Sequence, residues 1–409
     1  MKTGFAGWML KGFAISATVC VLGIGALLLS LWLERRTDLT LPMPTGPFAV
    51  SRVIYDWKDD TAIDPLSPVP QTNRELLIWI WYPTRPSQPL PADDYVPAQM
   101  RTLAGPKGGL LSLLSRDLSK VHAHSIANTE LAPLQQSYPV LVMRAGASLE
   151  TWNYTTLAED LASHGYIVVG FDAPYRTFTV VFPDGRVRRR TPDNSPDHCL
   201  EKTGEEQEQC AIRLLNAWTA DASFVLSRLG QLNASTESGN FTGRIDLTRV
   251  GVFGHSFGGA TAALLCHEDS RCTAGMDVDG APLGSVIQTG IGRPFMFLLS
   301  DHERDPEPEV RQVTANIQSI YDRLPPDGRA ILEIRGANHF LFSDDGALLK
   351  SHIVMNTLRL FGIVGIAGPR QLAVTAYCLR SFFDVHLKGA GRSRFEIPSP
   401  LYPEIQALK

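Results

Sequence analysis

The sequence predicts an α/β protein whose mostly parallel, doubly wound sheet carries helices on both faces. Two observations predict this class. First, 44% of the 409 residues are hydrophobic and 20% are charged, which provides apolar material for one large core and excludes a disordered or fibrous chain. Second, short apolar runs alternate with segments of helical periodicity over roughly 250 residues, as in repeated strand, helix, strand units.

Each element follows from a local pattern. Aromatic and β-branched residues indicate a strand at 74–82, which Pro83 ends. Further strands are predicted at 139–144, 166–171, 249–254, 274–278, 294–300 and 330–335. Helical periodicity predicts helices at 152–164, 206–229, 259–266, 310–324 and 370–387. The turn residues Pro183-Asp184-Gly185 predict a hairpin over 178–188.

The N-terminal 36 residues have the composition of a membrane anchor. Residues 13–33 are 21 nearly uninterrupted apolar positions without a charge, close to the roughly 20 residues with which a helix crosses a membrane. The alternative is a cleaved signal peptide, which has a shorter apolar region and a small-x-small cleavage site. We expect a single-pass transmembrane helix in residues 1–36 and a polar connector in 37–47. One folded domain should occupy 48–409, with an irregular insertion around 103–133.

The charges that flank the apolar stretch only slightly favour one orientation of this anchor in the membrane. Lys2, Lys11 and the terminal amine precede the apolar stretch, and Arg35 and Arg36 follow it. The positive-inside rule therefore slightly favours a cytoplasmic N-terminus and a domain outside the cytoplasm.

The cysteines bear on the same question. Cys199 and Cys210 form one close-spaced pair, Cys266 and Cys272 form another, and Cys378 is left over. If the two pairs are disulfides, the domain faces an oxidising compartment; four ordinary thiols are the alternative.

Composition also argues against several partners and cofactors. The formal charge of -4 argues against nucleic acid, which requires a clustered excess of Lys and Arg. A short basic run consists of Arg186, Arg188, Arg189 and Arg190. We interpret it as the solvated edge of the predicted hairpin. No nucleotide-binding loop is present, and His122, His124 and His198 lack further residues at metal-ligand spacing, so we expect neither cofactor nor metal.

The motif Gly254-His255-Ser256-Phe257-Gly258 carries the chemistry. It follows the strand at 249–253 and precedes a run of small residues that opens a helix. This is the context of the nucleophile elbow of the α/β-hydrolase fold, in which glycines make room for a strained serine at a strand-to-helix turn. A bare Gly-x-Ser-x-Gly is a weak signal, so the flanking strand and helix carry the interpretation. We predict that Ser256 is a catalytic nucleophile.

A serine nucleophile needs a base, and His339 follows the predicted strand at 330–335 in the order that this fold requires. His302, His352 and His386 are interpreted as surface or core residues. The acid that orients the imidazole should lie at a strand end between Ser256 and His339. Two residues fit, Asp279 and Asp301, and periodicity does not decide between them.

The oxyanion hole requires two backbone N–H groups. One comes from the residue after the nucleophile, Phe257, and the other from a loop after an early strand, for which Ala147 in Ala145-Gly146-Ala147 fits. Phe257, Phe340 and Phe342 beside the triad fit an apolar acyl site, and Trp152, Phe340 and Phe342 are the expected substrate contacts.

These residues resemble the platelet-activating factor acetylhydrolase family, especially its bacterial members. The similarity covers most of residues 45–405. It includes Thr45-Gly46-Pro47, RELLIWIWYP at 74–83, residues 139–147, LASHGY at 161–166, the elbow, GMDVD at 275–279 and SFFDVHL at 381–387. Several of these stretches are specific to the family. The resemblance implies that Asp279 is the acid, because the family takes it from the strand after the elbow helix.

The resemblance further implies hydrolysis of short or oxidised acyl chains from phospholipids, or of simple soluble esters, without a cofactor. One departure concerns the oxyanion loop, where the family usually has His-Gly and this chain has Ala145-Gly146. The alternative functions are a catalytically silent, membrane-tethered binding protein and a dienelactone or amide hydrolase on the same scaffold. A dienelactone hydrolase normally uses cysteine, whereas this elbow has serine.

Overall fold

A ten-stranded sheet organises the computed structural model, which describes residues 3–104, 109–301, 308–391, 397 and 399–408. The strands lie in the order β14 (Ile405–Ala407), β13 (Arg329–Ile334), β12 (Phe295–Leu299), β11 (Ala274–Val278), β10 (Ile245–His255), β6 (Tyr138–Arg144), β7 (Ile167–Asp172), β3 (Asn73–Thr84), β2 (Ala49–Ile63) and β5 (Ile126–Ala127). Neighbours from β7 to β13 are parallel, whereas β3 is antiparallel to both β2 and β7, and β14 is antiparallel to β13. The predicted mixed α/β class with a large sheet is therefore confirmed.

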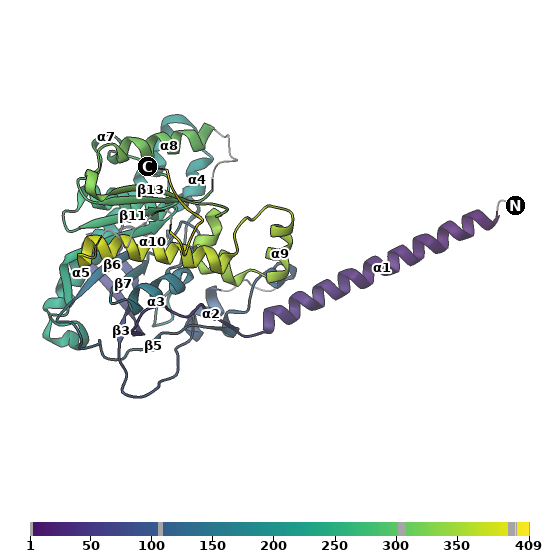
Figure 1. Cartoon of the computed structure of the whole chain (residues 1–409), viewed down its shortest axis with the longest axis horizontal. Coiled ribbons are helices and arrows are strands. Elements are labelled where there is room, and N and C mark those ends of the chain that lie inside the picture. The colour runs from purple at the N-terminus through teal and green to yellow at the C-terminus, as the bar shows by residue number, and fades with distance from the viewer. Residues whose placement is uncertain (1–2, 105–108, 302–307, 392–396, 398, 409) are drawn as a thin grey trace.

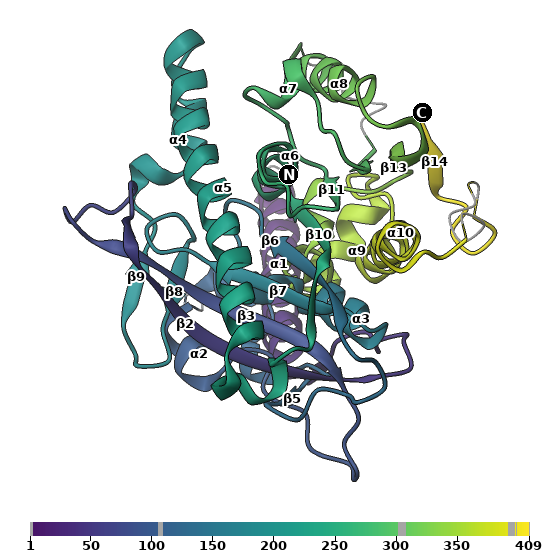
Figure 2. The same ribbon diagram turned by 90° about the vertical axis from the view of Figure 1, so that its left-hand side faces the viewer.

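Helices cover both faces of this sheet (Figures 1 and 2). Residues of α3 (Thr155–Ser163) and α10 (Gly368–Lys388) belong to one core cluster. Residues of α5 (Gly204–Ala234), α6 (Phe257–Glu268) and α8 (Pro308–Tyr321) belong to the other. The shorter helices are α2 (Ala98–Ala104), α4 (Pro196–Leu200), α7 (Val286–Thr289) and α9 (His352–Leu360).

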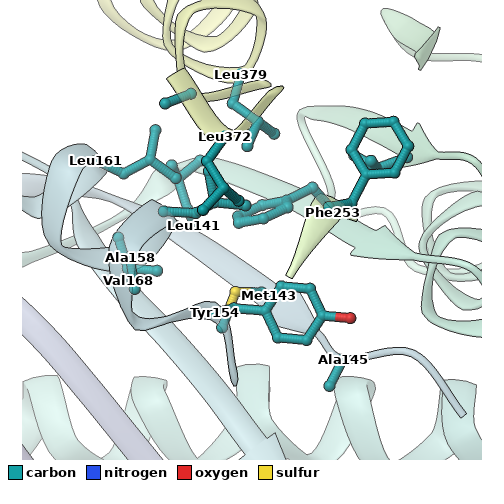
Figure 3. Packing of buried hydrophobic residues seen from close by; sticks show 14 of the residues in the cluster. Leu141, Met143, Ala145, Tyr154, Ala158, Leu161, Val168, Phe253, Leu372 and Leu379 are labelled. Atoms are coloured by element: carbon teal, nitrogen blue, oxygen red, sulfur yellow. The ribbon is translucent and has the colours of Figure 1, made fainter. Parts of the chain in front are cut away.

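The two core clusters result from the two-residue period of the strands. In β3, Trp79 and Trp81 belong to the cluster with α3 and α10, whereas Ile78 and Ile80 belong to the other. This is expected where alternate side chains point to opposite faces and both faces are buried. Figure 3 shows part of the first cluster, in which Leu372 and Leu379 of α10 and Leu161 of α3 lie near Leu141 of β6.

Two features of the sheet differ from the sequence prediction. The strand β3 continues through Pro83 to Thr84, although proline was expected to end it. Pro83 is tolerated because it lies beyond Leu77–Trp81, the part of β3 that pairs with β7, and its carbonyl accepts a hydrogen bond from Ala132 N. The 15-residue strand β2 had no predicted counterpart. The predicted hairpin is confirmed as β8 (Thr179–Val181) and β9 (Val187–Arg189), which pair antiparallel.

The N-terminal helix α1 (Thr3–Arg36) extends away from the rest of the chain (Figure 1). Its segment Ile15–Arg36 is long and apolar enough to cross a membrane by length and composition. The end of the helix is fixed to the folded domain. Arg35 Nη1 donates to the carbonyl of Ser112 at 2.8 Å, and Arg116 Nη1 donates to the carbonyl of Glu34 at 2.6 Å. The Glu34 carboxylate in turn accepts from the backbone N–H of His352 at 2.5 Å.

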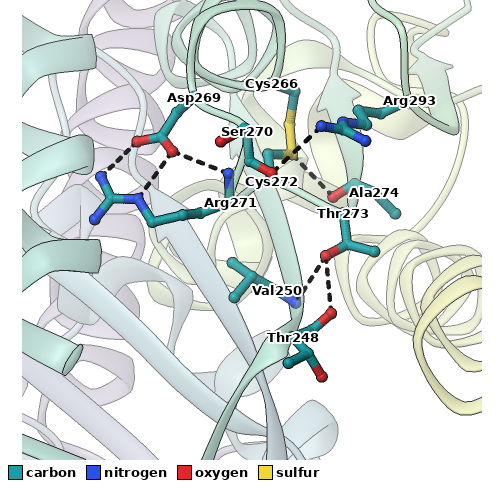
Figure 4. Close-up of a disulfide and its surroundings, with 10 residues drawn as sticks. All are labelled: Thr248, Val250, Cys266, Asp269, Ser270, Arg271, Cys272, Thr273, Ala274 and Arg293. Atoms are coloured by element: carbon teal, nitrogen blue, oxygen red, sulfur yellow. Dashed lines mark hydrogen bonds and ion pairs between the residues drawn. A yellow bond between two sulfur atoms is a disulfide. The ribbon is translucent and has the colours of Figure 1, made fainter.

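Both suggested cysteine pairs are disulfides, and Cys378 is a buried free thiol. The Cys199–Cys210 disulfide joins α4 to α5. The Cys266–Cys272 disulfide joins the end of α6 to the residues before β11 (Figure 4). In the same turn, Asp269 forms an ion pair with Arg271. The first crosslink therefore ties α4 to α5, and the second ties the end of α6, the elbow helix, to the segment that leads into β11.

Candidate active site

Ser256 occupies the turn between β10 and α6, as an elbow requires. Its φ of 57° and ψ of -126° lie outside the ordinary regions for a side-chain-bearing residue. The glycines on either side are sterically required. A Cβ on Gly254 would lie 2.1 Å from the carbonyl oxygen of Gly258, and a Cβ on Gly258 would lie 2.3 Å from that of Arg144. The tightly packed turn therefore holds Ser256 in a strained backbone conformation, and Ser256 lines a cavity there.

The structure brings Ser256, His339 and Asp279 into hydrogen-bonding contact. His339 Nε2 lies 3.1 Å from Ser256 Oγ, and His339 Nδ1 lies 2.7 Å from Asp279 Oδ2. The Asp279 side chain is 2% exposed, whereas the His339 side chain is 35% exposed. This arrangement lets the imidazole take a proton from the serine while the buried carboxylate orients the ring and stabilises its cation.

Ser300, at the end of β12, holds the Asp279 carboxylate. The backbone N–H of Ser300 donates to Asp279 Oδ1 at 2.8 Å, and its hydroxyl donates to Asp279 Oδ2 at 2.7 Å. Sequence reasoning missed Ser300, because a serine that ends an apolar strand is a common residue with no pattern of its own.

The other acid considered, Asp301, supports the histidine from a distance. Asp301 Oδ2 accepts a hydrogen bond from Gly336 N at 2.7 Å, at the start of the histidine loop, residues 336–342. Gln371 of α10 holds the same loop through both backbone groups of Asn338, at 3.0 and 2.8 Å. These bonds fix the backbone that carries His339, which is a different task from orienting its ring.

Asp277, two residues before Asp279, is also buried but has a different environment. Burial is the main cause that raises the pKa of Asp277 well above its ordinary value. Asp277 Oδ1 accepts from Gly280 N at 2.7 Å, and a Cβ on Gly259 would lie 1.9 Å from this oxygen. Asp277 therefore packs against the elbow helix at Gly259, whereas Asp279 is the carboxyl group that contacts the imidazole.

The two expected oxyanion donors lie on the same cavity as Ser256 and His339. Phe257 is the first residue of α6, so its N–H has no partner within the helix and lies at the positive end of the helix dipole. Ala147 follows β6 in the oxyanion loop, residues 145–147. The Ala147 carbonyl accepts from Arg190 Nη1 at 2.9 Å, which holds the loop from the hairpin side.

A cavity of about 470 Å³ opens at these residues. Its apolar walls are Phe257, Leu283, Leu299, Val310, Val313 and Ile317. Cys199 and Leu200 of the disulfide-linked helix α4 also line it. The volume lies in the range of about 300–1,000 Å³ that is typical of small-molecule sites. An acetyl group would fill a small part of this space.

The three expected substrate contacts do not line this cavity. Trp152 is 7% exposed and packs edge-on against Tyr95, with ring centroids 5.6 Å apart. Phe342 is fully buried against the ring of His255. Phe340 is 72% exposed and lies against the His339 ring on the outside. The expectation was wrong for the cavity, because closeness to the site in sequence does not fix the direction of a side chain.

Two other expectations concern histidines and metals. His352 lies at the start of α9, 3.9 Å from Glu34, and His386 packs against Phe382 in α10, so both lie away from the triad. His302 lies outside the described residues. Within the described part of the chain, no group of three or more His, Cys, Asp or Glu side chains could hold a metal ion.

Comparison with known proteins decides the family. Residues 36–377 match the family model of platelet-activating factor acetylhydrolase, isoform II. This chain belongs to that family. A probable 1-alkyl-2-acetylglycerophosphocholine esterase of Arthroderma benhamiae is 25% identical over 397 residues, which cover 91% of this chain and 94% of that protein. The platelet-activating factor acetylhydrolase of Cavia porcellus is 23% identical over 344 residues, with coverages of 77% and 73%.

A solved structure leads to the same class of activity. A ferulic acid esterase from Streptomyces cinnamoneus superposes with a TM-score of 0.71 and 26% identity, covering 91% of this chain and 100% of that chain. As a member of the platelet-activating factor acetylhydrolase family with an esterase as structural neighbour, the chain is a serine hydrolase that acts on esters.

Proposed function

We propose that this protein is a membrane-anchored carboxylic-ester hydrolase of the α/β-hydrolase fold that works through an acyl-enzyme on Ser256. The observation that carries the proposal is the chain of contacts from Ser256 Oγ to His339 Nε2 at 3.1 Å and from His339 Nδ1 to Asp279 at 2.7 Å, on an apolar cavity. Sheet order supports the fold assignment, because the nucleophile follows a central parallel strand.

The reaction has two halves. Ser256 Oγ attacks the ester carbonyl carbon while its proton passes to His339 Nε2, and the negative oxygen of the tetrahedral intermediate accepts from the N–H groups of Phe257 and Ala147. The C–O bond then breaks, and His339 gives the proton to the departing alcohol. Water next attacks the acyl-serine with His339 as base, and the released acid restores the free hydroxyl.

The substrate class follows from the cavity and the family. The named relatives act on an acetylated glycerophosphocholine and on ferulic acid esters, which share an ester and little else. The cavity has apolar walls and about 470 Å³ of space. We propose that it takes the acyl group, and that short-chain phospholipid esters or small esters with acyl groups larger than acetyl are the preferred substrates.

Placement in a membrane is supported by the composition of Ile15–Arg36. The two disulfides and the charges of Lys2 and Lys11 favour a domain outside the cytoplasm. Because Glu34 and Arg35 are bonded to the folded domain, removal of residues 1–30 is the appropriate truncation. The truncated chain should be soluble and active, and the full chain should sediment with membranes. A truncated chain that still sediments with membranes would contradict the proposal that residues 1–30 anchor the protein.

The experiment for the activity is ester hydrolysis by the purified full-length chain. Ser256→Ala and His339→Ala should each lower kcat by about 10³-fold or more. The matched control is Ser285→Ala, an exposed serine before α7. Equal activity of Ser256→Ala and Ser285→Ala would overturn the mechanism.

A further inference from the structure

Two buried side chains, Tyr154 and His255, lie between the oxyanion loop and the histidine loop. The Tyr154 hydroxyl lies 2.7 Å from His255 Nδ1 and accepts a hydrogen bond from Gly146 N at 3.1 Å. His255 Nε2 lies 3.0 Å from the backbone carbonyl of His339. One continuous chain of hydrogen bonds therefore joins Gly146, beside the expected oxyanion donor, to the residue that carries the expected base.

The direction of every bond in this chain follows from the partners. The His339 carbonyl accepts, so His255 Nε2 carries a hydrogen. In a neutral imidazole the other nitrogen accepts, so the Tyr154 hydroxyl donates to His255 Nδ1 while it accepts from Gly146 N. Burial is the main cause that lowers the pKa of His255 to about 3, with a further contribution from His339. The chain keeps this direction throughout the neutral range.

Packing leaves little freedom around these bonds. A Cβ on Gly146 would lie 3.1 Å from His255 Nδ1 and 3.3 Å from the Tyr154 hydroxyl, so the loop rests directly on the pair. The His255 ring lies 4.6 Å from the His339 ring and 5.6 Å from the Phe342 ring, measured between centroids. Phe342, expected to contact substrate, instead packs against this histidine.

We propose that Tyr154 and His255 are positioning residues that hold the oxyanion loop and the catalytic histidine in one fixed geometry around the ester carbonyl. This inference rests on the proposed function. Both residues act through backbone groups of the machinery, Gly146 N and His339 O, and neither lines the cavity. Their effect should appear in the rate of chemistry, because a displacement of about 1 Å between reacting groups can cost about 10²-fold.

Tyr154→Phe removes the central hydroxyl and keeps the ring. We expect kcat for a small activated ester to fall about 10- to 100-fold with KM within about twofold of wild type. Phosphonylation by a fluorophosphonate, whose oxygen occupies the oxyanion hole, should slow in parallel.

The matched control is Tyr138→Phe, which removes another buried tyrosine hydroxyl, one that donates to the Ala132 carbonyl at 2.8 Å. It should lower thermal stability and leave kcat unchanged. If the two variants lose kcat equally, a general structural role explains Tyr154 and the inference fails.

A double-mutant cycle tests the connection itself. His255→Phe keeps an aromatic ring and removes both hydrogen bonds. If the pair forms one connection, the double variant should lose no more kcat than the worse single variant. Multiplied losses would mean that the residues act separately and would overturn the inference. Failure of the proposed function is distinguishable, since wild type itself would then neither hydrolyse esters nor react with the fluorophosphonate.

Discussion

Asp279 Oδ2 lies 2.7 Å from Nδ1 of His339, and both oxygens of this carboxylate accept hydrogen bonds from Ser300. Asp279 has a φ of 56°, a conformation that side-chain-bearing residues rarely adopt. The buried, fully bonded position restricts the carboxylate to one orientation, which is the property that an orienting acid needs.

This geometry predicts a ranking of two conservative variants. Asp279→Asn should lower kcat by about 10³- to 10⁴-fold, because an amide stabilises neither the required imidazole tautomer nor its cation. Asp301→Asn changes a carboxylate that holds Gly336 N and should cost about 10-fold or less. Steady-state kinetics on one ester compares them, and the reverse ranking would assign the acid to Asp301.

The sequence predicted the sheet better than it predicted the side chains on it. Strand 274–278 coincides with β11, because a run buried on both faces has a strong apolar signal. The strand β2 was missed because its second half, Asp56–Ile63, is mostly polar. In this half, β2 pairs with β3 alone. Polar, half-solvated strands lack the pattern on which such predictions depend.

The sequence pattern also could not decide between Asp279 and Asp301. Both follow neighbouring parallel strands, so both reach the same edge of the sheet. The direction of each side chain decides which one meets the imidazole, and local pattern does not encode it. Apart from Phe257, the apolar cavity walls were missed for a related reason. Leu283, Leu299 and Val313 come from three separate segments and meet only in the folded chain.

The cavity predicts that acyl size can be changed by one residue. Val313→Trp in α8 should lower kcat/KM for octanoyl esters about 10-fold or more and leave acetyl esters within about twofold, because the added ring occupies the acyl space. The control is Gln312→Trp, an exposed neighbour on the same helix that does not line the cavity. Equal loss on acetyl and octanoyl esters would place the acyl group elsewhere.

Removal of either disulfide should lower stability, but removal of only one of them should change the preference for acyl size. Replacing either pair by alanine should lower the free energy of unfolding by about 2–3 kcal/mol, since both close short loops. Cys199 lines the cavity, whereas Cys266, near the end of α6, and Cys272, just after that helix, are buried and do not line it. Only Cys199→Ala/Cys210→Ala should therefore alter the ratio of octanoyl to acetyl hydrolysis. The same ratio in both double variants would contradict a role for α4 in the cavity.

Asp344 predicts a pH dependence of stability. Burial is the main cause that raises its pKa to about 7, although Thr156 N and the Tyr95 hydroxyl donate to it. Between about pH 4 and 7, Asp344 therefore carries a proton in the folded state but not in the unfolded state. Its contribution to stability is present at low pH and is lost as the pH rises through 7.

The variant Asp344→Asn isolates this contribution. The melting temperature of Asp344→Asn minus that of wild type should increase from pH 5 to pH 8, because the variant avoids burying a charge. Thermal unfolding at a series of pH values measures this difference. A difference that is constant or decreases with pH would contradict the assignment.

The most direct test of the central claim is covalent labelling of the full-length chain by a fluorophosphonate, followed by mass spectrometry of its peptides. We expect one adduct on Ser256, formed slowly in His339→Ala and absent in Ser256→Ala, because the reagent requires a serine activated by its base. Absence of an adduct on the folded wild-type chain, or labelling that persists on another residue in Ser256→Ala, would show that Ser256 is not the activated nucleophile.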